Sequence, residues 1–160
     1  MYCEAYYLSP LGWIKIKAEG KYIIALYFVD GEENFTAVPE ENETIDKCMK
    51  QLDEYFHGSR VKFSIPFKLY GTPFQEEVWN NLQSIPYGRT KSYKDIAKKI
   101  GSANLSRAVG QTNALNPVAI IVPCHRVIGS NGDLTGYAGG VDRKKWLLDF
   151  EQKFFQPKLF

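Results

Sequence analysis

One of the three cysteines, Cys124, stands in a setting that favours nucleophilic chemistry. His125 and Arg126 follow it directly, and a cation near a thiol lowers the thiol pKa and raises the fraction of thiolate, which is the nucleophile. Pro123 fixes the backbone on entry to this turn. A lone cysteine is more often an inert, buried side chain. Adjacent side chains seldom face each other, so we expect any coupling between Cys124 and His125 to run through a water.

Two other groups of residues could bind a metal or a ligand, but their sequence patterns are weaker. Cys3, Cys48 and His57 could form a zinc site only if the fold gathered them, because the sequence has no C-x-x-C pair; we expect no metal site. The glycine-rich run 136–140 lacks the Lys-Ser/Thr that follows a phosphate-binding loop. It suits either a close backbone approach to a ligand or a loop without a binding role.

A pair of short helices precedes the cysteine. The apolar spacing predicts helices over residues 92–100 and 105–115, joined by a turn at Gly101, with the dimensions of a helix-turn-helix. The second helix carries Arg107, Gln111 and Asn113, together with small residues that allow close approach to a groove. Any helical hairpin has this outline, so DNA binding is one interpretation and a purely structural hairpin is the other.

The composition is that of an ordinary globular protein. The chain has 160 residues, 44% of them hydrophobic and 24% charged, with a formal net charge of +2. The charge is uneven, at −3 up to Gly71 and +5 from Thr72 onward, so a polyanion would meet the C-terminal half. No apolar run is long enough to span a bilayer, and the N-terminus does not resemble a signal peptide. Three cysteines fit a reducing compartment, and we expect a cytoplasmic protein with no membrane partner.

The N-terminal part is expected to form an antiparallel sheet with one helix. Alternation predicts strands over residues 12–18 and 22–28, with a third over 2–8 and a short one over 61–65. A polar stretch at 30–42 is expected to be a surface loop. Ile45, Met49, Leu52 and Phe56 mark one face of an amphipathic helix that Gly58 ends. We place this domain at 1–66 and a linker at 67–71.

The C-terminal part, 72–160, is expected to be mainly helical. Thr72 offers an N-cap, with a proline at the first helical position and a capping-box glutamine after it. Ser92 can cap the next helix, and a buried run at 118–122 leads to the cysteine. Asp142 is expected to cap a last helix containing Trp146, Leu147 and Phe150. The fold class is therefore α+β, with a helix-turn-helix, winged-helix-like second domain.

The residues then become specific to one family. Pro123-Cys124-His125-Arg126-Val127 resembles the active-site signature of the O6-alkylguanine-DNA alkyltransferases. Further matching blocks, in the family's order and spacing, are Phe74-Gln75, Val78-Trp79, Ile85-Pro86-Tyr87-Gly88-Arg89-Thr90, Ser92-Tyr93, Asp95-Ile96-Ala97, Arg107-Ala108-Val109-Gly110, Asn116-Pro117, Leu134-Thr135-Gly136-Tyr137 and Leu147-Leu148 to Glu151. The resemblance covers nearly all of residues 72–151 and is weak before Pro66.

The resemblance implies a methylated-DNA–protein-cysteine S-methyltransferase. Such a protein moves methyl or other alkyl groups from O6 of guanine, and from O4 of thymine, irreversibly onto its own cysteine, here Cys124. His125 would be the base, acting through a water, and Glu151 would orient its imidazole. Asn116 would tie the helix to the active-site turn. Tyr93 would donate a hydrogen bond to the guanine, with Lys144 orienting Tyr93 or the nearby loop.

The resemblance also implies how DNA is bound. The target base is flipped out of the duplex, and Arg107 enters the stack in its place, with the second helix in the minor groove. The DNA-binding residues carried over are Arg107, Ala108, Gln111, Thr112 and Arg126. The residues of the substrate pocket are Val127, Tyr137, Ala138 and Lys144. Carbonyl groups of Cys124 and Val127 would read the exocyclic amine of guanine, and N–H groups near Ala138 would meet O6.

Two departures and two alternatives accompany this interpretation. Ala138 stands where some members have serine, and Asn113 and Gln111 make the second helix more polar than in many relatives, without touching the nucleophile. The partner expected is double-stranded DNA with O6-alkylguanine, bound by a monomer without a cofactor. The alternatives are a lesion-binding module that performs no transfer, and a cysteine hydrolase that uses Cys124, His125 and Glu151.

Overall fold

The computed structural model describes residues 2–30 and 41–155. The chain divides into two compact units. The N-terminal unit comprises Met1–Tyr70 and Pro117–Ile121, and the C-terminal unit comprises Gly71–Asn116 and Val122–Phe160. The N-terminal unit therefore includes a short segment, Pro117–Ile121, from the second half of the chain. The division at 67–71 drawn from the sequence stays a prediction.

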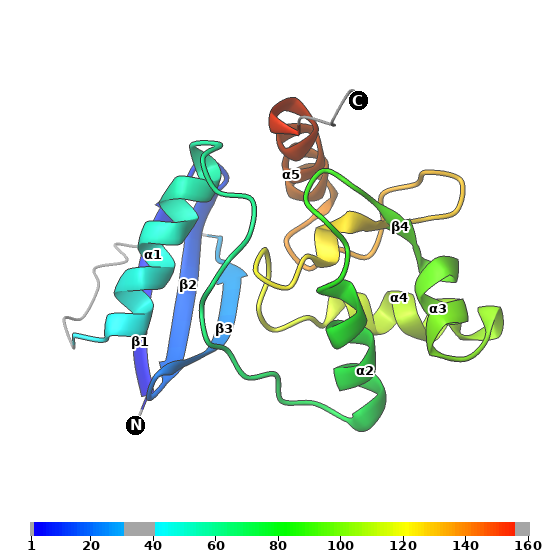
Figure 1. Ribbon diagram of the computed structural model, residues 1–160, viewed down its shortest axis with the longest axis horizontal. Helices are drawn as coiled ribbons and strands as arrows, with labels where there is room; N and C mark the ends of the chain where they lie inside the picture. The colour runs from blue at the N-terminus through cyan, green and yellow to red at the C-terminus, as the bar shows by residue number, and fades with distance from the viewer. Residues whose placement is uncertain (1, 31–40, 156–160) are drawn as a thin grey trace. The chain divides into compact units, whose positions relative to one another are not determined.

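The N-terminal unit is built on an antiparallel sheet of order β1-β2-β3 (Figure 1). Its strands are β1 (Tyr2–Ser9), β2 (Gly12–Glu19) and β3 (Tyr22–Phe28). The alternation along β2 places Ile14, Ile16 and Ala18 on a fully buried face, as the sequence predicts. The three predicted strands are thus confirmed.

One helix, α1 (Glu43–Phe56), packs against this sheet. Asn42 caps its start by accepting a hydrogen bond from the Ile45 amide at 3.0 Å. Ile45 and Leu52 are buried, which confirms the predicted apolar face. Of the predicted surface loop at 30–42, residues 31–40 lie outside the described residues.

The predicted strand over residues 61–65 is wrong. This segment forms no regular strand, and only Phe67 makes a bridge, parallel to Ile23 of β3. The Ile23 amide donates to the Pro66 carbonyl at 3.0 Å, and the Lys68 amide donates to the Ile23 carbonyl at 2.9 Å. Pro66 has no amide hydrogen, so pairing is confined to its carbonyl and the residues after it.

The segment Pro117–Ile121 is attached to β3 by backbone hydrogen bonds. The Leu26 amide donates to the Pro117 carbonyl at 2.8 Å, and the Ala119 amide donates to the Leu26 carbonyl at 2.9 Å. Ile120 has a φ of 69°, which is rare for a β-branched residue, and the chain turns sharply there. The run is buried, as predicted, but forms a tight turn rather than regular structure.

The C-terminal unit is mainly helical, which confirms the α+β fold class. Its elements are α2 (Pro73–Leu82), β4 (Lys91–Ser92), α3 (Tyr93–Ile100), the 3₁₀ turn η1 (Ala103–Leu105), α4 (Ser106–Ala114), the 3₁₀ turn η2 (Cys124–Arg126), β5 (Val127–Ile128) and α5 (Val141–Phe154). The strands β4 and β5 pair in parallel. Figure 1 shows α3 and α4 as neighbouring helices, and they are in contact. The helix-turn-helix is therefore present.

The predicted helix caps are observed at α2 and α3 but not at α5. Thr72 and Ser92 both form capping boxes, at α2 and α3. The prediction that Asp142 caps the last helix is wrong, because Gly140, at a φ of 95°, occupies that position without a side-chain bond. Asp142 lies in the first turn, where its negative charge complements the helix dipole.

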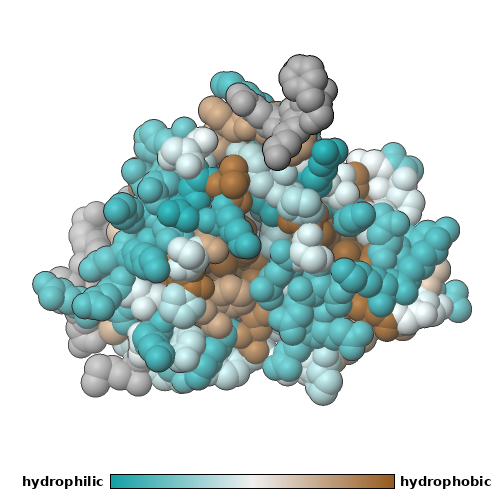
Figure 2. Space-filling model, viewed as in Figure 1, coloured by the Kyte–Doolittle hydropathy of each residue, from teal (hydrophilic) through white to brown (hydrophobic). Residues whose placement is uncertain are grey.

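The visible surface over the helices of the C-terminal unit is largely hydrophilic, with scattered apolar residues (Figure 2). Within the described part of the chain, no helix is both long and apolar enough to cross a membrane. Cys3, Cys48 and His57 do not gather into a set of three ligands, and the described residues contain no other group of three His, Cys, Asp or Glu suited to a metal ion.

Candidate active site

Cys124 begins the tight turn η2 and is buried, with 4% of its surface exposed. Its amide donates to the Val122 carbonyl at 2.8 Å, and the Arg126 amide donates to the Pro123 carbonyl at 3.0 Å. Val122 and Pro123 are themselves buried. The turn is therefore fixed by its own backbone before any side chain contributes.

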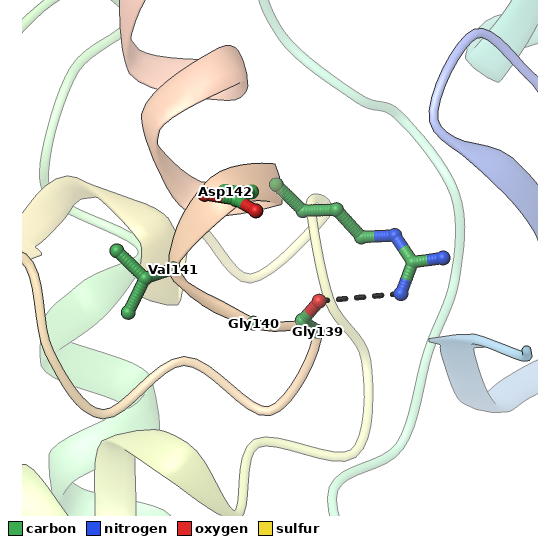
Figure 3. A pocket seen from close by; sticks show the side chains of 5 residues that line it. Gly139, Gly140, Val141 and Asp142 are labelled. Atoms are coloured by element: carbon green, nitrogen blue, oxygen red, sulfur yellow. Dashed lines mark hydrogen bonds between the residues drawn. The ribbon is translucent and has the colours of Figure 1, made fainter.

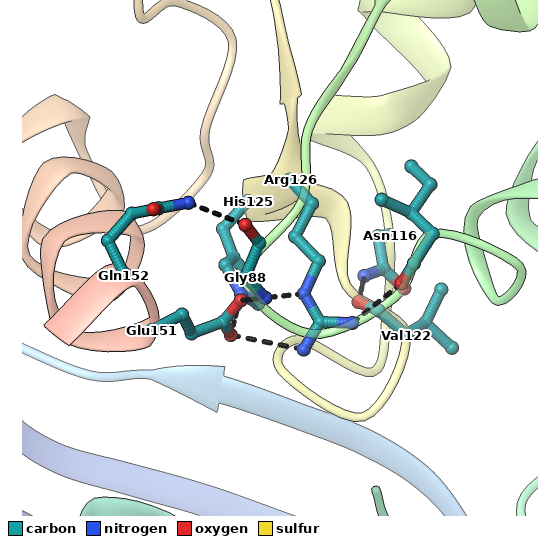
Figure 4. Close-up of polar contacts among 8 residues, drawn as sticks. Gly88, Asn116, Val122, His125, Arg126, Glu151 and Gln152 are labelled. Atoms are coloured by element: carbon teal, nitrogen blue, oxygen red, sulfur yellow. Dashed lines mark hydrogen bonds and ion pairs between the residues drawn. The ribbon is translucent and has the colours of Figure 1, made fainter. Parts of the chain in front are cut away.

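His125 faces the last helix instead of the adjacent thiol. Its Nε2 lies 2.6 Å from Oε2 of Glu151, and both side chains are buried (Figure 4). A carboxylate can only accept hydrogen bonds, so Nε2 carries the hydrogen and, in a neutral ring, Nδ1 carries the lone pair. Nδ1 is buried without a hydrogen-bond partner among the described residues. The histidine is thus oriented by Glu151, and its basic nitrogen is left available.

Arg126 also turns inward. Its Nε donates to Oε1 of Glu151 at 2.8 Å, its Nη2 donates to Oε2 at 3.1 Å, and its Nη1 donates to the Ile85 carbonyl at 2.8 Å (Figure 4). The residue is 7% exposed. Its guanidinium is bound inside the unit, which differs from the DNA-binding position expected from the resemblance.

The buried environment shifts these groups in different directions. Burial alone would raise the pKa of the Glu151 carboxyl, but His125 and Arg126 hold it well below its usual range. Burial lowers the pKa of His125, although Glu151 acts in the opposite direction. Glu151 is therefore ionised, and the imidazole is biased toward its neutral form.

Burial raises the pKa of the Cys124 thiol to about 11, with the Asn116 side chain and the Lys144 charge acting the other way. The sequence suggested that His125 and Arg126 would lower this pKa, but both are engaged by Glu151. In the unliganded protein the sulfur is consequently a thiol at neutral pH.

A second polar cluster involves Lys144, Tyr93 and Thr135. The Lys144 ammonium donates to the Thr135 carbonyl at 2.8 Å and to the Tyr93 hydroxyl at 3.2 Å, and that hydroxyl donates to the Thr135 carbonyl at 2.6 Å. Lys144 is fully buried, and burial lowers its pKa to about 8. Gly136 permits this packing, because a Cβ there would lie 3.1 Å from the Tyr93 oxygen.

Two asparagines connect α4 to the cysteine turn. Asn116 Nδ2 donates to the Val122 carbonyl at 2.8 Å, which places Asn116 in the linking position expected from the resemblance. Asn113 is fully buried, and its Nδ2 donates to the Cys124 carbonyl at 3.1 Å. The expectation that Asn113 adds polarity to the DNA face is wrong, because the side chain is buried; its hydrogen bond to Cys124 is made with the backbone carbonyl. Its spacing four residues after buried Val109 could have indicated the inward orientation.

The Cys124 carbonyl accepts a second hydrogen bond, from the Val127 amide. A carbonyl oxygen has two lone pairs, so this group is already saturated. It differs in this respect from the carbonyl expected to read the guanine amine. Val127 itself is fully buried.

The exposed side of α4 carries Arg107 and Gln111, one turn apart. Ala108 is partly exposed beside them. Thr112 is buried, and its carbonyl accepts a hydrogen bond from Trp79 Nε1 at 2.9 Å. The helix therefore presents Arg107 and Gln111 and buries Thr112 and Asn113, whereas Ser106 at its start is half-buried.

The glycine-rich loop leads into α5 beside an open pocket. Tyr137 is buried with its hydroxyl unpaired among the described residues, whereas Ala138 is exposed. The pocket is lined by Gly139, Gly140, Val141, Asp142 and Arg143, and Arg143 closes one side by donating to the Gly139 carbonyl at 3.2 Å (Figure 3).

Comparison with known proteins agrees with this arrangement. The family pattern described as 6-O-methylguanine DNA methyltransferase, DNA binding domain, matches residues 73–153, and the pattern for its ribonuclease-like domain matches residues 1–69. The chain belongs to the O6-methylguanine-DNA methyltransferase family. The family resemblance drawn from the sequence is confirmed.

Curated relatives cover nearly the whole chain. The methylated-DNA–protein-cysteine methyltransferase of Mycobacterium leprae is 44% identical over 90% of this chain and 88% of its own. The constitutive enzyme of Bacillus subtilis is 43% identical over 94% and 95%. The crystal structure of the Mycobacterium tuberculosis O6-methylguanine methyltransferase has a TM-score of 0.87 at 39% identity, covering 99% and 98%. A structure of the same organism's protein in complex with DNA has a TM-score of 0.85 at 40% identity, covering 94% and 93%.

Proposed function

We propose that this protein repairs O6-methylguanine in double-stranded DNA by moving the methyl group to Sγ of Cys124. The observation that carries the proposal is the placement of Cys124 in a family-specific turn whose next residue, His125, makes a buried hydrogen bond to Glu151. A bond forms between sulfur and the methyl carbon, and the bond from that carbon to O6 breaks. The thiol proton balances the charge left on the guanine, so no cofactor enters the reaction.

The proton must leave the thiol as the lesion binds, because the resting thiol has a raised pKa. His125 Nδ1 is the acceptor, through a water, since its other nitrogen is committed to Glu151. Lys144 adds positive charge that favours the thiolate. Asn116 and Asn113 hold the backbone of the turn while this transfer takes place.

The leaving guanine needs a donor for its developing negative charge. Tyr93 supplies it once its hydroxyl exchanges the Thr135 carbonyl for the base, and Lys144 holds the hydroxyl in place during this exchange. The lesion pocket is formed by Val127, Tyr137 and Ala138, with the Val127 carbonyl reading the guanine amine and an amide near Ala138 meeting O6. The same pocket takes other O6-alkyl groups and O4-alkylthymine.

DNA docks on the exposed side of α4. Arg107 and Gln111 are available there, and Ala108 allows close approach to a minor groove. The target atom lies inside the base stack and the sulfur is buried, so the nucleotide is flipped out, with Arg107 filling its place. Thr112 and Arg126 are both buried, so their part in DNA binding is to support α4 and the cysteine turn from inside the C-terminal unit. The Mycobacterium tuberculosis protein was crystallised in complex with DNA, which supports DNA as the partner of this chain.

Each molecule reacts once, because the thioether product is stable. A single chain suffices for the reaction, and the lack of a disulfide among the three cysteines suits the reducing cytoplasm.

The test is the intact mass of the protein after incubation with duplex DNA carrying O6-methylguanine. With excess lesion we expect a gain of one methyl group per chain and no further increase. Cys124→Ser should bind the same duplex without gaining mass. Binding by the unaltered protein without mass gain would mean a lesion-binding module, and continued turnover would mean a hydrolase; either result contradicts the proposal.

A further inference from the structure

Arg126 shares one carboxylate with the histidine. Both oxygens of Glu151 accept from its guanidinium, at 2.8 and 3.1 Å, and Oε2 also accepts from His125 at 2.6 Å. The three side chains are almost entirely buried. A bidentate pair of this kind is directional as well as strong, so the carboxylate is fixed in plane and position.

The guanidinium is held independently of the carboxylate. Its Nη1 donates to the Ile85 carbonyl at 2.8 Å, and its carbon lies 5.6 Å from the centre of the Tyr87 ring. The Gly88 amide, from the same turn, approaches Oε1 of Glu151 at 3.4 Å (Figure 4). The turn 85–88 therefore supports Arg126 and Glu151 together.

Charge balance then determines the state of the histidine. Arg126 and Glu151 cancel each other, so a neutral imidazole leaves the buried trio uncharged, whereas a protonated one leaves an uncompensated buried charge. Without Arg126 the buried carboxylate would have only the imidazole as a close cation, and the pair would favour imidazolium with carboxylate. Such a ring has no lone pair with which to accept a proton from Cys124.

We propose that Arg126 is a positioning residue that keeps His125 neutral, with its hydrogen on Nε2 and its lone pair on Nδ1. The inference deepens the proposed function, on which it rests for its consequence in alkyl transfer. Arg126 thereby sets the lowest pH at which the base can work, without contacting DNA or the lesion. The lowered pKa of His125, caused first by burial, is in keeping with this role.

Other titratable groups around His125, Arg126 and Glu151 belong to four segments and stay unchanged in the test. They are Cys124 in η2, Lys144 in α5, Tyr87 in the turn 85–88 and Tyr137 in the glycine-rich loop.

The experiment uses the full chain labelled with ¹⁵N at histidine. The sequence has only two histidines, and His57, which is exposed, provides the internal reference. We expect His125 in the unaltered protein to be neutral at pH 7 with the hydrogen on Nε2. In Arg126→Met we expect an imidazolium at pH 7, with the His125 titration midpoint raised by at least about one pH unit. Arg126→Lys should keep the ring neutral by supplying a cation.

Alkyl transfer is measured on the same variants as a single-turnover rate against pH. For Arg126→Met we expect at least a tenfold loss at pH 7 that is recovered at higher pH, with the acid limb shifted as far as the NMR midpoint. Lys145→Met removes a cation from an exposed pair with Asp149 on α5 and should change neither readout.

The proposal is overturned if the unaltered protein holds an imidazolium at pH 7, a result that requires no variant to fold. It is also overturned if Arg126→Met leaves the His125 signals unchanged, if its rate falls equally at all pH values, or if Arg126→Lys holds a protonated ring. Failure of methyl transfer in the unaltered protein would contradict the proposed function alone, because the NMR readout does not depend on it.

Discussion

The two units bury very different side chains. Among the described residues, the polar or charged side chains buried in the N-terminal unit are Ser9 and Gln51. Those buried in the C-terminal unit are Thr112, Asn113, Asn116, His125, Arg126, Lys144 and Glu151. Buried polar groups are costly unless they are paired. In the C-terminal unit these buried polar groups include the residues around Cys124. The core of the N-terminal unit is therefore suited to stability, and the core of the C-terminal unit is suited to chemistry.

The two buried cysteines make the same point. Burial raises the pKa of Cys48 to about 12, and no neighbouring group opposes the shift. Burial also dominates at Cys124, but Asn116 and Lys144 act against it. Burial of a thiol is therefore common to both units, whereas partners that can stabilise a thiolate are found at Cys124.

The largest expected effect separates these two thiols. Cys124→Ala should abolish methyl transfer completely, because Cys124 is the thiol that stands in the active-site turn. Cys48→Ala should leave the transfer rate unchanged and lower the free energy of unfolding by on the order of 1 kcal/mol through lost packing. Single-turnover transfer and urea denaturation measure the two effects. Loss of transfer in the Cys48 variant despite a native fold would contradict the comparison.

The next largest effect is on stability, and it distinguishes the buried polar groups of the C-terminal unit from those of the N-terminal unit. Glu151→Gln leaves the Arg126 charge buried without a counter-ion, and we expect a loss of about 3–5 kcal/mol in unfolding free energy together with slower transfer. Gln51→Met removes paired hydrogen bonds with Ser64 and should cost about 1–3 kcal/mol without affecting transfer. Urea denaturation gives both values. Equal stability losses in the two variants would contradict this account.

The pH dependence of stability sharpens the comparison further. The folded protein keeps the Cys124 proton up to about pH 11, whereas an ordinary thiol loses it near 9.0. The stabilisation that the folded state gains from holding a protonated Cys124 is therefore fully present below about pH 9. It is lost as pH rises to about 11, which lowers the free energy of unfolding by about 2–3 kcal/mol. Cys124→Ser lacks it. The stability difference between the two chains should accordingly shift in favour of the variant over that range.

Cys48 is present in both chains, so its own titration cancels in this comparison, whereas the charge coupling between Cys124 and Lys144 is part of the Cys124 contribution that the comparison measures. Urea denaturation at pH 8.5 and pH 10.5 measures the shift. A stability difference that stays constant with pH would show that the folded Cys124 thiol ionises normally.

The smallest effect concerns two glycines with positive φ. A Cβ at Gly88, where φ is 77°, would lie 2.6 Å from the Phe155 ring, whereas one at Gly20, where φ is 58°, would meet nothing within 4 Å. Gly20→Ala should cost about 1 kcal/mol from backbone strain alone. Gly88→Ala should cost more, by about 1–2 kcal/mol, and slow transfer through Glu151. Equal costs, measured by urea denaturation, would mean that the turn 85–88 does not support the site.

Much of the fold could be predicted from the sequence, because its local signals agree with the tertiary structure. The alternation in 12–18, the capping boxes at Thr72 and Ser92, and the stop at Gly101 all correspond to observed elements. The strand predicted at 61–65 was wrong because its alternation is not matched by backbone pairing next to a proline. The prediction of Asp142 as the cap was wrong because Gly140 occupies the cap position two residues earlier and the helix starts at Val141.

The site was only partly predictable for a different reason. Sequence adjacency placed His125 and Arg126 next to the cysteine, but a 3₁₀ turn directs successive side chains apart, and both bind Glu151 on a distant helix. Asn113 belonged to the buried stripe of its helix by spacing, yet its polarity suggested an exposed position. Burial of a polar residue depends on a partner elsewhere in the chain, which local patterns do not specify.

The most direct test of the central claim is to locate the methyl group after reaction with DNA carrying O6-methylguanine. Digestion and mass analysis of the peptides distinguish the three cysteines. The account predicts one methyl group per chain, on the sulfur of the peptide containing Cys124, and none on the peptides containing Cys3 or Cys48. A methyl group on either of those two thiols, or methylguanine left intact in the DNA, would contradict it.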